Sequence, residues 1–157
     1  IRVYVSRINV HEKSENLEKI IQEEENNNIF NIDTLNKFAL DVASHRTKLL
    51  QLLNKLRSEG KSIVGVSAPA KGMTLLNYCH IGPEMLDFVT EKSKLKIGLY
   101  TPGLHIPIVP DSELLEGQPD YALLLAWNFA EEIMDNLSEY RQKGGKFIIP
   151  IPEPHIV

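Results

Sequence analysis

Residues 60–77 read GKSIVGVSAPAKGMTLLN, and this stretch decides the fold. Its first half places Ile63, Val64 and Val66 in a short apolar run between glycines, which is typical of a strand buried on both faces of a parallel sheet. A helix is predicted to follow almost at once, because Pro69 suits a first helical turn and the leucines beyond it supply an apolar face. The segment therefore predicts a strand, a tight turn and a helix.

The turn between this strand and helix is predicted to be an anion site. It presents free backbone N–H groups and a helix N-terminus beyond the carboxyl end of the strand, an arrangement that binds phosphate. Gly65, Ser67 and Ala70 occupy the three positions of a G-x-G-x-x-G/A dinucleotide-type fingerprint, with serine in place of the second glycine. So short a fingerprint is not specific by itself.

The composition limits the class of protein. A chain of 157 residues with 43% hydrophobic content can bury one core, which predicts one domain with appendages. The net charge of −4 and the lack of a Lys/Arg-rich patch argue against nucleic acid as a partner. One cysteine, Cys79, excludes a disulfide framework and a four-cysteine zinc site, which predicts a reducing cytoplasm. No apolar run approaches the ~20 residues that span a bilayer, so no membrane anchor is predicted, and the initial isoleucine suggests a fragment.

The N-terminal residues are predicted to form a strand and a short helix. Apolar and polar residues alternate over positions 1–8, as in a half-buried strand, and such a strand needs another edge to join. Residues 14–25 favour a short polar helix. Its glutamates at 23–25 are expected to be solvated rather than to hold a metal, because three consecutive carboxylates on a helix point in three directions.

Residues 33–58 form the longest periodic segment. Their apolar side chains recur at helical spacing and Gly60 follows, which predicts one long amphipathic helix that packs on the sheet or links to another module. His45 lies among polar neighbours in this helix. A surface histidine is favoured over a catalytic base, because no acid or nucleophile accompanies it.

The chain from Gly60 onward alternates between strands and helices. This alternation predicts an α/β fold, namely a Rossmann-like and mainly parallel sheet of about four strands with flanking helices. The last long helix is expected to begin at Asn128 as N-cap, with Glu131 three residues on completing a capping box. Ligands of such sheets bind outside the carboxyl ends of the strands. The predicted later strands are 85–90, 121–126 and 146–149, and the predicted helices between them are 111–116 and 129–141.

Three side chains fall near these carboxyl ends. Glu91 lies about 20 residues beyond the glycine-rich turn, where dinucleotide-binding domains place the acid that holds a ribose. The alternative is that Glu91 is a solvated carboxylate in a charged run. His105 follows a turn in which Gly103 needs a positive φ, and it is either a phosphate or ribose contact or part of a packed loop. Trp127 is either a stacking surface for a base or a cover for the core.

Four blocks of the sequence are SIVGVSAPAKGMTLLNYC at 62–79, DFVTEKSKLKIGLYTPGLHIPI at 87–108, PDYALLLAWNFAEEIM at 119–134 and GGKFIIPIPEP at 144–154. In this order they resemble the C-terminal domain of the sugar-nucleotide C-methyltransferases, which add methyl groups to deoxysugars attached to a nucleoside diphosphate. The resemblance implies that this domain holds the nucleotide-sugar. A central domain would then hold S-adenosylmethionine and the catalytic base, and an N-terminal domain would bind zinc.

The resemblance also implies domain boundaries. A strand like IRVY closes the S-adenosylmethionine-binding domain in that family. Residues 1–30 therefore look like the tail of a missing domain plus a linker, and 31–157 look like the Rossmann-like C-terminal domain with its leading helix. No separate glycine-rich strand-turn-helix unit for the methyl donor precedes Gly60, so the fragment alone is expected to bind no cofactor, to hold no metal and to be inactive.

The chain departs from the turn GYGAPAKGNT that is usual in the family. Val66, Ser67 and Met73 stand where Tyr, Gly and Asn are expected, and His80 replaces a common Gly. Ser67 adds a side chain to the pyrophosphate cradle, and Met73 removes a polar contact.

Two functions from different classes follow. The first is a nucleotide-sugar-binding module that works with the missing S-adenosylmethionine-binding domain, with Lys71 as counter-charge, Asn77 as a polar contact and Glu91 near a ribose. The second is a non-catalytic regulatory or scaffold domain that binds another nucleotide or NAD in the same pocket. The predicted substrate-binding residues are Ser67, Ala68, Pro69, Ala70, Lys71, Gly72, Thr74, Asn77, Glu91 and His105.

Overall fold

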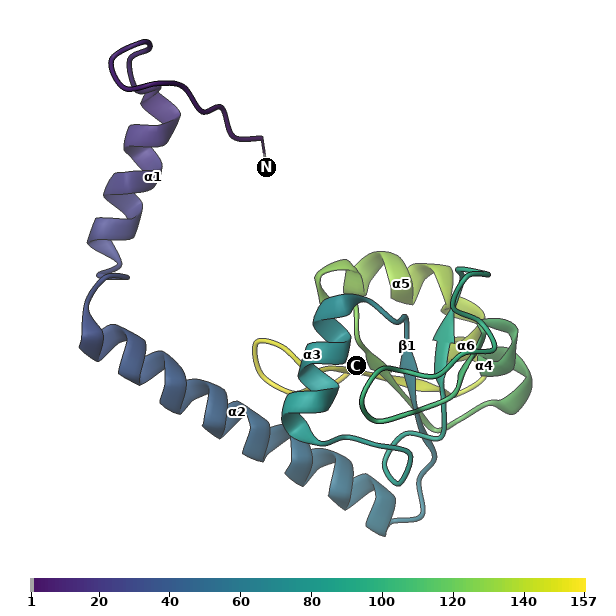
Figure 1. Cartoon of the computed structure of the whole chain (residues 1–157). Helices are drawn as coiled ribbons and strands as arrows, with labels where there is room; N and C mark the ends of the chain where they lie inside the picture. Colours follow the sequence, from purple (N-terminus) through teal and green to yellow (C-terminus); the bar gives the residue numbers. More distant parts are fainter. Residues whose placement is uncertain (1) are drawn as a thin grey trace. The chain divides into compact units, whose positions relative to one another are not determined.

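The structure is a computed structural model that describes residues 2–157, and these fall into two units. One unit extends up to Ala43 and the other comprises Ser44–Val157. The first unit holds helix α1 (Glu15–Asn26) and the N-terminal part of helix α2 (Ile32–Ser58) (Figure 1). Both helices begin within one residue of the predicted positions, which confirms the two helical segments.

The segment before α1 contains no strand among its described residues. Residues 2–8 are exposed and form no ladder, so the strand predicted there is wrong, while Ile1 lies outside the described residues. A strand is stable only when it pairs with another edge, and none of the described residues pairs with this segment. The helix that follows is capped by Ser14, whose side chain accepts a hydrogen bond from the backbone N–H of Leu17 at 3.3 Å.

Helix α2 is unbroken over its 27 residues, as its periodicity predicts. Its C-terminal part belongs to the second unit and buries Leu49, Leu53 and Leu56 in the core. Gly60 ends the segment with φ at +75°, a conformation that glycine adopts at no steric cost.

The second unit is built on a six-stranded sheet in the order β3-β2-β1-β4-β5-β6. Strands β1 to β5 are parallel, and β6 pairs antiparallel with β5 at one edge. The fold is therefore the mainly parallel Rossmann-like α/β sheet that the sequence predicts. The strands are β1 (Ile63–Val66), β2 (Val89–Glu91), β3 (Ile108–Pro110), β4 (Tyr121–Leu124), β5 (Lys146–Ile149) and β6 (His155–Ile156).

The prediction of four strands is correct for β1, β4 and β5 and partly correct for β2. The second strand begins at Val89 rather than at Met85, because the N–H groups of Met85 and Leu86 both bond to Gly82 O in a turn. The edge strands β3 and β6 are additional.

Helices cover both faces of the sheet (Figure 1). Helix α3 (Ala70–Cys79) and the end of α2 pack on one face, and the other face is covered by α4 (Ser112–Gly117), α5 (Ala130–Asn136) and α6 (Ser138–Gln142). Neighbouring residues of β1 point to opposite faces, so Ile63 joins the first cluster and Val64 the second. None of the helices in the described part of the chain is long and apolar enough to cross a membrane.

The prediction of one long helix over residues 129–141 is wrong in two respects. A 3-10 turn, η1 (Trp127–Phe129), precedes α5, and Phe129 rather than Asn128 is the N-cap, without a side-chain hydrogen bond. The helix also breaks at Leu137, whose φ of −107° and ψ of 26° are not helical and whose side chain is buried. The capping box predicted from Glu131 therefore does not form.

Candidate functional site

The turn that joins β1 to α3 lies at the carboxyl edge of the parallel strands. The Ser67 N–H donates to Thr90 O of the neighbouring strand β2 at 2.9 Å, which holds the chain as it leaves the sheet. Pro69 is the N-cap of α3 and offers no side-chain hydrogen bond. The first N–H groups of α3 have no intrahelical acceptor by helix geometry, so they are available to an anion.

Ser67 adopts a left-handed conformation, with φ at +69°. Such a φ is uncommon for residues other than glycine and costs on the order of 1–2 kcal/mol. The serine therefore occupies a position whose backbone suits the glycine of the usual turn. Gly65, by contrast, is needed for sheet packing, because a Cβ there would lie 2.9 Å from Val89 Cγ2.

Glu91 and Lys96 hold this turn by its backbone. Oε2 of Glu91 accepts hydrogen bonds from the Ala68 N–H at 3.2 Å and from the Lys96 ammonium at 3.0 Å. The same ammonium donates to Ala68 O at 2.9 Å, so both backbone polar groups of Ala68 are bound by the ion pair. Oε1 of Glu91 accepts from the N–H groups of Lys92 at 2.9 Å and Ser93 at 3.1 Å.

The carboxylate of Glu91 is therefore saturated by its own chain. A carboxylate has about four lone-pair directions, and Glu91 already accepts four hydrogen bonds. Burial raises the pKa of Glu91, but the bonds from the Lys96 ammonium and from the backbone N–H groups of Ser93 and Lys92 outweigh burial and lower it. In this structure Glu91 shapes the turn and has no free oxygen lone pair for a ribose hydroxyl.

The Lys71 ammonium lies over two aromatic rings. Its Nζ is 4.7 Å from the ring centroid of Trp127 and 5.8 Å from that of Phe129. Both distances are within the range of cation–π attraction. The first turn of α3 is thereby connected to the residues that follow β4.

Asn77 and His105 are not part of this turn. Asn77 is seven residues beyond Ala70, which is about 10 Å along a helix, and its Nδ2 donates to Met73 O at 2.8 Å and to Pro102 O at 3.1 Å. His105 is exposed, with φ at +55°, on the loop that Pro102 begins. Asn77 thus anchors the loop of His105 against the end of α3. The positive φ predicted for Gly103 in this loop is confirmed at +84°.

His45 is not the plain surface histidine that the sequence predicts. Its Nε2 lies 2.6 Å from Pro150 O, beyond the end of β5, and the side chain is partly buried. A carbonyl oxygen can only accept a hydrogen bond, so Nε2 of His45 carries the proton and donates a hydrogen bond to Pro150 O. The residue fastens α2 to the segment between β5 and β6.

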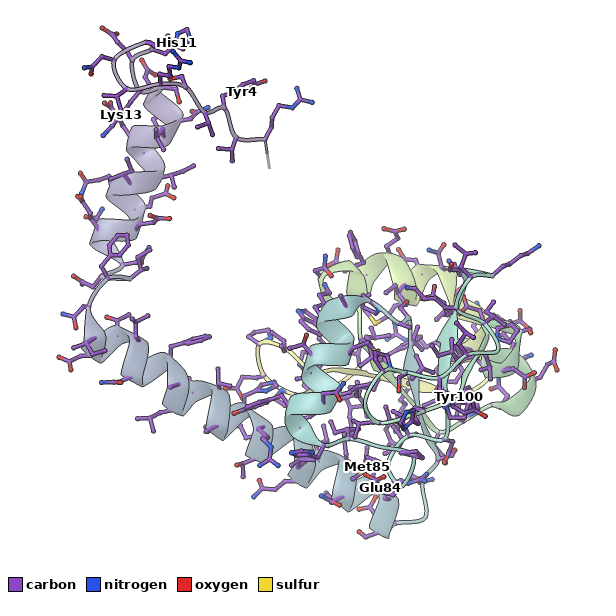
Figure 2. The ribbon with its side chains drawn as sticks, viewed as in Figure 1. Tyr4, His11, Lys13, Glu84, Met85 and Tyr100 are labelled. Atoms are coloured by element: carbon purple, nitrogen blue, oxygen red, sulfur yellow. The ribbon has the colours of Figure 1, made fainter. Side chains whose placement is uncertain are left out.

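Three hollows are lined by residues of the turn or by residues near the carboxyl ends of the strands. The first, here called the Trp127 hollow, has a volume of about 500 Å³, and the smallest, of about 100 Å³, lies beyond the ends of β1 and β2. The third, of about 390 Å³, is lined by Tyr100 from the loop between β2 and β3 (Figure 2). The Trp127 hollow is lined by Trp127, Asn128, Phe129, Ala130, Glu131, Glu132, Met134, Ile149, Ile151, Pro152 and His155. The smallest is lined by Val66, Ser67, Glu91, Lys92, Asp111, Ile133, Asn136 and Leu137.

A separate hollow belongs to the first unit. It lies between the N-terminal segment and α1, has a volume of about 470 Å³ and is lined by Tyr4, His11 and Lys13 among others (Figure 2). Among the residues that the structure describes, no group of three or more His, Cys, Asp or Glu side chains is placed to hold a metal ion.

The structure brings most of the predicted cradle together. Residues 67–72 form the turn and the first turn of α3, with Glu91 beside them, while the Thr74 hydroxyl is used by its own helix and donates to Ala70 O at 3.2 Å. Sequence reasoning missed Lys96 and Phe129. Lys96 is signalled only by its position five residues after Glu91, and Phe129 only by its position two residues after Trp127.

A parallel sheet with helices on both faces, and a strand-turn-helix unit at its carboxyl edge, defines a Rossmann-like α/β domain. Residues 1–152 match the family described as the C-methyltransferase C-terminal domain, and the chain belongs to this family. It is similar to the C-methyltransferase NovU of Streptomyces niveus, with 37% identity over 147 residues, which is 94% of this chain and 35% of NovU. The chain thus spans about a third of the length of that relative. The resemblance to the C-terminal domain of C-methyltransferases is confirmed.

Proposed function

We propose that this chain is the nucleotide-sugar-binding domain of a C-methyltransferase that uses S-adenosylmethionine. The observation that carries the proposal is the turn between β1 and α3, where free N–H groups of a helix without a side-chain cap lie at the carboxyl edge of a parallel sheet. The diphosphate would bind these N–H groups, with residues 67–72 as its cradle and Lys71 as counter-charge. Membership of a C-methyltransferase family supports a sugar-nucleotide over other anions.

S-adenosylmethionine is assigned to another part of the full protein. The described residues before Ser44 form two helical segments, turns and irregular chain but no strand, so they offer no carboxyl sheet edge for a methyl donor. In the second unit, the strand-turn-helix unit of β1 and α3 at the sheet edge holds the turn that we assign to the diphosphate. We therefore expect the chain to contribute substrate binding and orientation, with methyl transfer dependent on a separate domain.

The regulatory or scaffold function, with NAD as ligand, receives less support. A dinucleotide-binding domain uses the acid after its second strand to hold a ribose, and Glu91 has no free lone pair for this role. Family membership also favours the transferase.

Backbone amide shifts measured by NMR during titration with thymidine diphosphate test the proposal. Shifts are expected to cluster at residues 67–72, with weak affinity, since each helix-terminus interaction with an anion contributes only ~0.3–1 kcal/mol at exposed sites. Shifts confined to other residues, or no shifts at all, would exclude the proposed site. Calorimetry with S-adenosylmethionine should show no binding, and micromolar affinity would refute the division of labour.

A matched pair of proline variants tests the role of the backbone donors. Ala70→Pro removes one N–H from the first position of α3, where proline is tolerated and the preceding ψ of 156° permits it. The control is Glu15→Pro at the same position of α1, where Ser14 has a ψ of 151°. Ala70→Pro should weaken binding of thymidine diphosphate severalfold while Glu15→Pro leaves it unchanged. Equal affinity for Ala70→Pro and the unmodified chain would show that these N–H groups bind no phosphate.

A further inference from the structure

The Trp127 hollow lies beyond the carboxyl ends of β4 and β5. Its lining residues include Trp127 and Phe129 of η1, Met134 of α5, and Ile149 and Ile151 at and beyond the end of β5. Its volume of about 500 Å³ falls in the range of ~300–1,000 Å³ that is usual for small-molecule sites. Ligands of open α/β sheets bind on this side.

The charged residues around the hollow determine which part of a nucleotide it can bind. Glu131 and Glu132 line it, and its described lining residues include no lysine or arginine. A phosphate would be repelled by these carboxylates, whereas a neutral ring with N–H donors would be accepted. The hollow therefore favours the uncharged planar part of a ligand.

A cation of the proposed phosphate cradle lies over the rings of Trp127 and Phe129. Lys71 is on the first turn of α3, and its Nζ lies 4.7 Å from the centroid of the Trp127 ring. A ligand with its phosphates at the turn thus has Lys71 beside it and the hollow next to Lys71. The separation of positive and negative groups matches a molecule that is anionic at one end and aromatic at the other.

The aromatic pair of Trp127 and Phe129 is not accounted for by core packing alone. Trp127 packs against the core in part, but Phe129 is 55% exposed. A large aromatic side chain that is half exposed beside a second ring offers a face for stacking, and a base stacked on an aromatic ring gains about 1–3 kcal/mol in single-stranded nucleic-acid sites.

We propose that the Trp127 hollow binds the base of the nucleotide, stacked against Trp127 and Phe129, with Lys71 between the base and the phosphates. This inference rests on the proposed nucleotide-binding function and adds a second subsite to it. The base subsite would explain how a site with one exposed helix N-terminus distinguishes a nucleotide from free phosphate.

Tryptophan fluorescence tests the proposal directly, since Trp127 is the single tryptophan of the chain. Thymidine diphosphate, thymidine and inorganic pyrophosphate are titrated into the full chain, and amide shifts of residues 67–72 are followed in parallel. Thymidine diphosphate should change both signals with one affinity, and it should bind more tightly than either pyrophosphate or thymidine.

Two exposed aromatic residues give a matched pair of variants. Phe129→Leu should weaken the binding of thymidine diphosphate about fivefold or more and leave the affinity for pyrophosphate unchanged. Tyr100→Leu, at a residue that is 63% exposed and lines the third hollow, should leave both affinities unchanged. Circular dichroism of both variants confirms that the fold is intact.

The outcomes separate this inference from the proposed function. Amide shifts at 67–72 without a change at Trp127, or a loss of affinity in Tyr100→Leu instead of Phe129→Leu, would overturn the base subsite and leave the phosphate site in place. No response of either signal to any of the three ligands would overturn the proposed function and the base subsite together.

Discussion

The backbone N–H of Ala68 donates a hydrogen bond to Oε2 of Glu91 at 3.2 Å, and this bond joins the turn after β1 to the end of β2. The carbonyl of the same residue accepts from Lys96, 28 positions along the chain. The side chain of Glu91 is only 13% exposed. The conformation of the proposed phosphate cradle therefore depends on an ion pair that need not touch the ligand.

Replacing Glu91 by glutamine should destabilise the domain by about 1–3 kcal/mol at neutral pH, because a charge-assisted network becomes a partly satisfied one. The lowered pKa of Glu91 means that its charged form stabilises the fold. This stabilisation is complete above the unfolded-state pKa of about 4.3 and is lost as the pH falls through the lower folded-state pKa. The free energy of unfolding, measured from pH 7 to pH 3, should differ between the two proteins at pH 7 and converge in acid.

Lys96→Met is the partner variant and Glu113→Gln the control. Lys96→Met should lose stability as Glu91→Gln does, and the double variant should lose less than the sum, since the two side chains act on the same backbone groups. Glu113 is exposed on α4, so its replacement should have little effect. Additive losses for Glu91 and Lys96 would show that the two side chains act independently.

Ser67→Gly should stabilise the domain, because the backbone of Ser67 is held at φ +69° and glycine adopts this conformation without strain. The strain removed is about 1–2 kcal/mol, reduced by the extra freedom that glycine gives the unfolded chain. Thermal unfolding measures the effect. Ser58→Gly, in the last turn of α2, is the control and should destabilise by up to about 1 kcal/mol. A lower melting temperature for Ser67→Gly would mean that the serine hydroxyl contributes more than the strain costs.

The parts of the fold that the sequence predicts are those with local signals. The strand at 63–66 and the helix from Ala70 follow from an apolar run and from Pro69 at the helix start, and both are confirmed. The strand Ile108–Pro110 was not predicted, because it is three residues long with proline at its end, and its pairing with β2 is a contact between distant parts of the chain. The break at Leu137 likewise follows from burial against the sheet, which a helical pattern does not reveal.

In the candidate site, too, features with a local sequence signal are predictable, and features that depend on distant contacts are not. The fingerprint predicts an anion site at residues 67–72, and this turn lies at the carboxyl edge of the sheet. The spacing of Glu91 predicted its position beside the cradle but not its partners, because the bonds to Ala68 and Lys96 depend on how the loop after β2 folds back. The Trp127 hollow depends on the C-terminal residues Ile149 and Ile151 and could not be predicted from the aromatic residues alone.

His45→Phe should destabilise the domain by about 1–3 kcal/mol, because it leaves the carbonyl of the buried residue Pro150 without the Nε2 donor at 2.6 Å. Denaturant unfolding measures the loss. The control is His11→Phe, since His11 is exposed in the first unit and should tolerate the change. Because the segment after Pro150 lines the Trp127 hollow, His45→Phe should also broaden the NMR signals of Ile151. Equal stability of His45→Phe and the unmodified chain would show that the hydrogen bond contributes nothing.

Gly103→Ala and Gly98→Ala form a pair that separates backbone strain from side-chain collision. Both glycines have φ at +84°, so alanine costs about 1–2 kcal/mol of strain at either position. A Cβ at Gly98 meets nothing within 4 Å, whereas a Cβ at Gly103 collides with Oδ1 of Asn77. Gly103→Ala should therefore lose more stability than Gly98→Ala, and the excess should vanish when Asn77 is also replaced by alanine. A double-mutant cycle on the free energy of unfolding measures this coupling, and equal losses at the two glycines would show that Asn77 moves aside and does not anchor the loop.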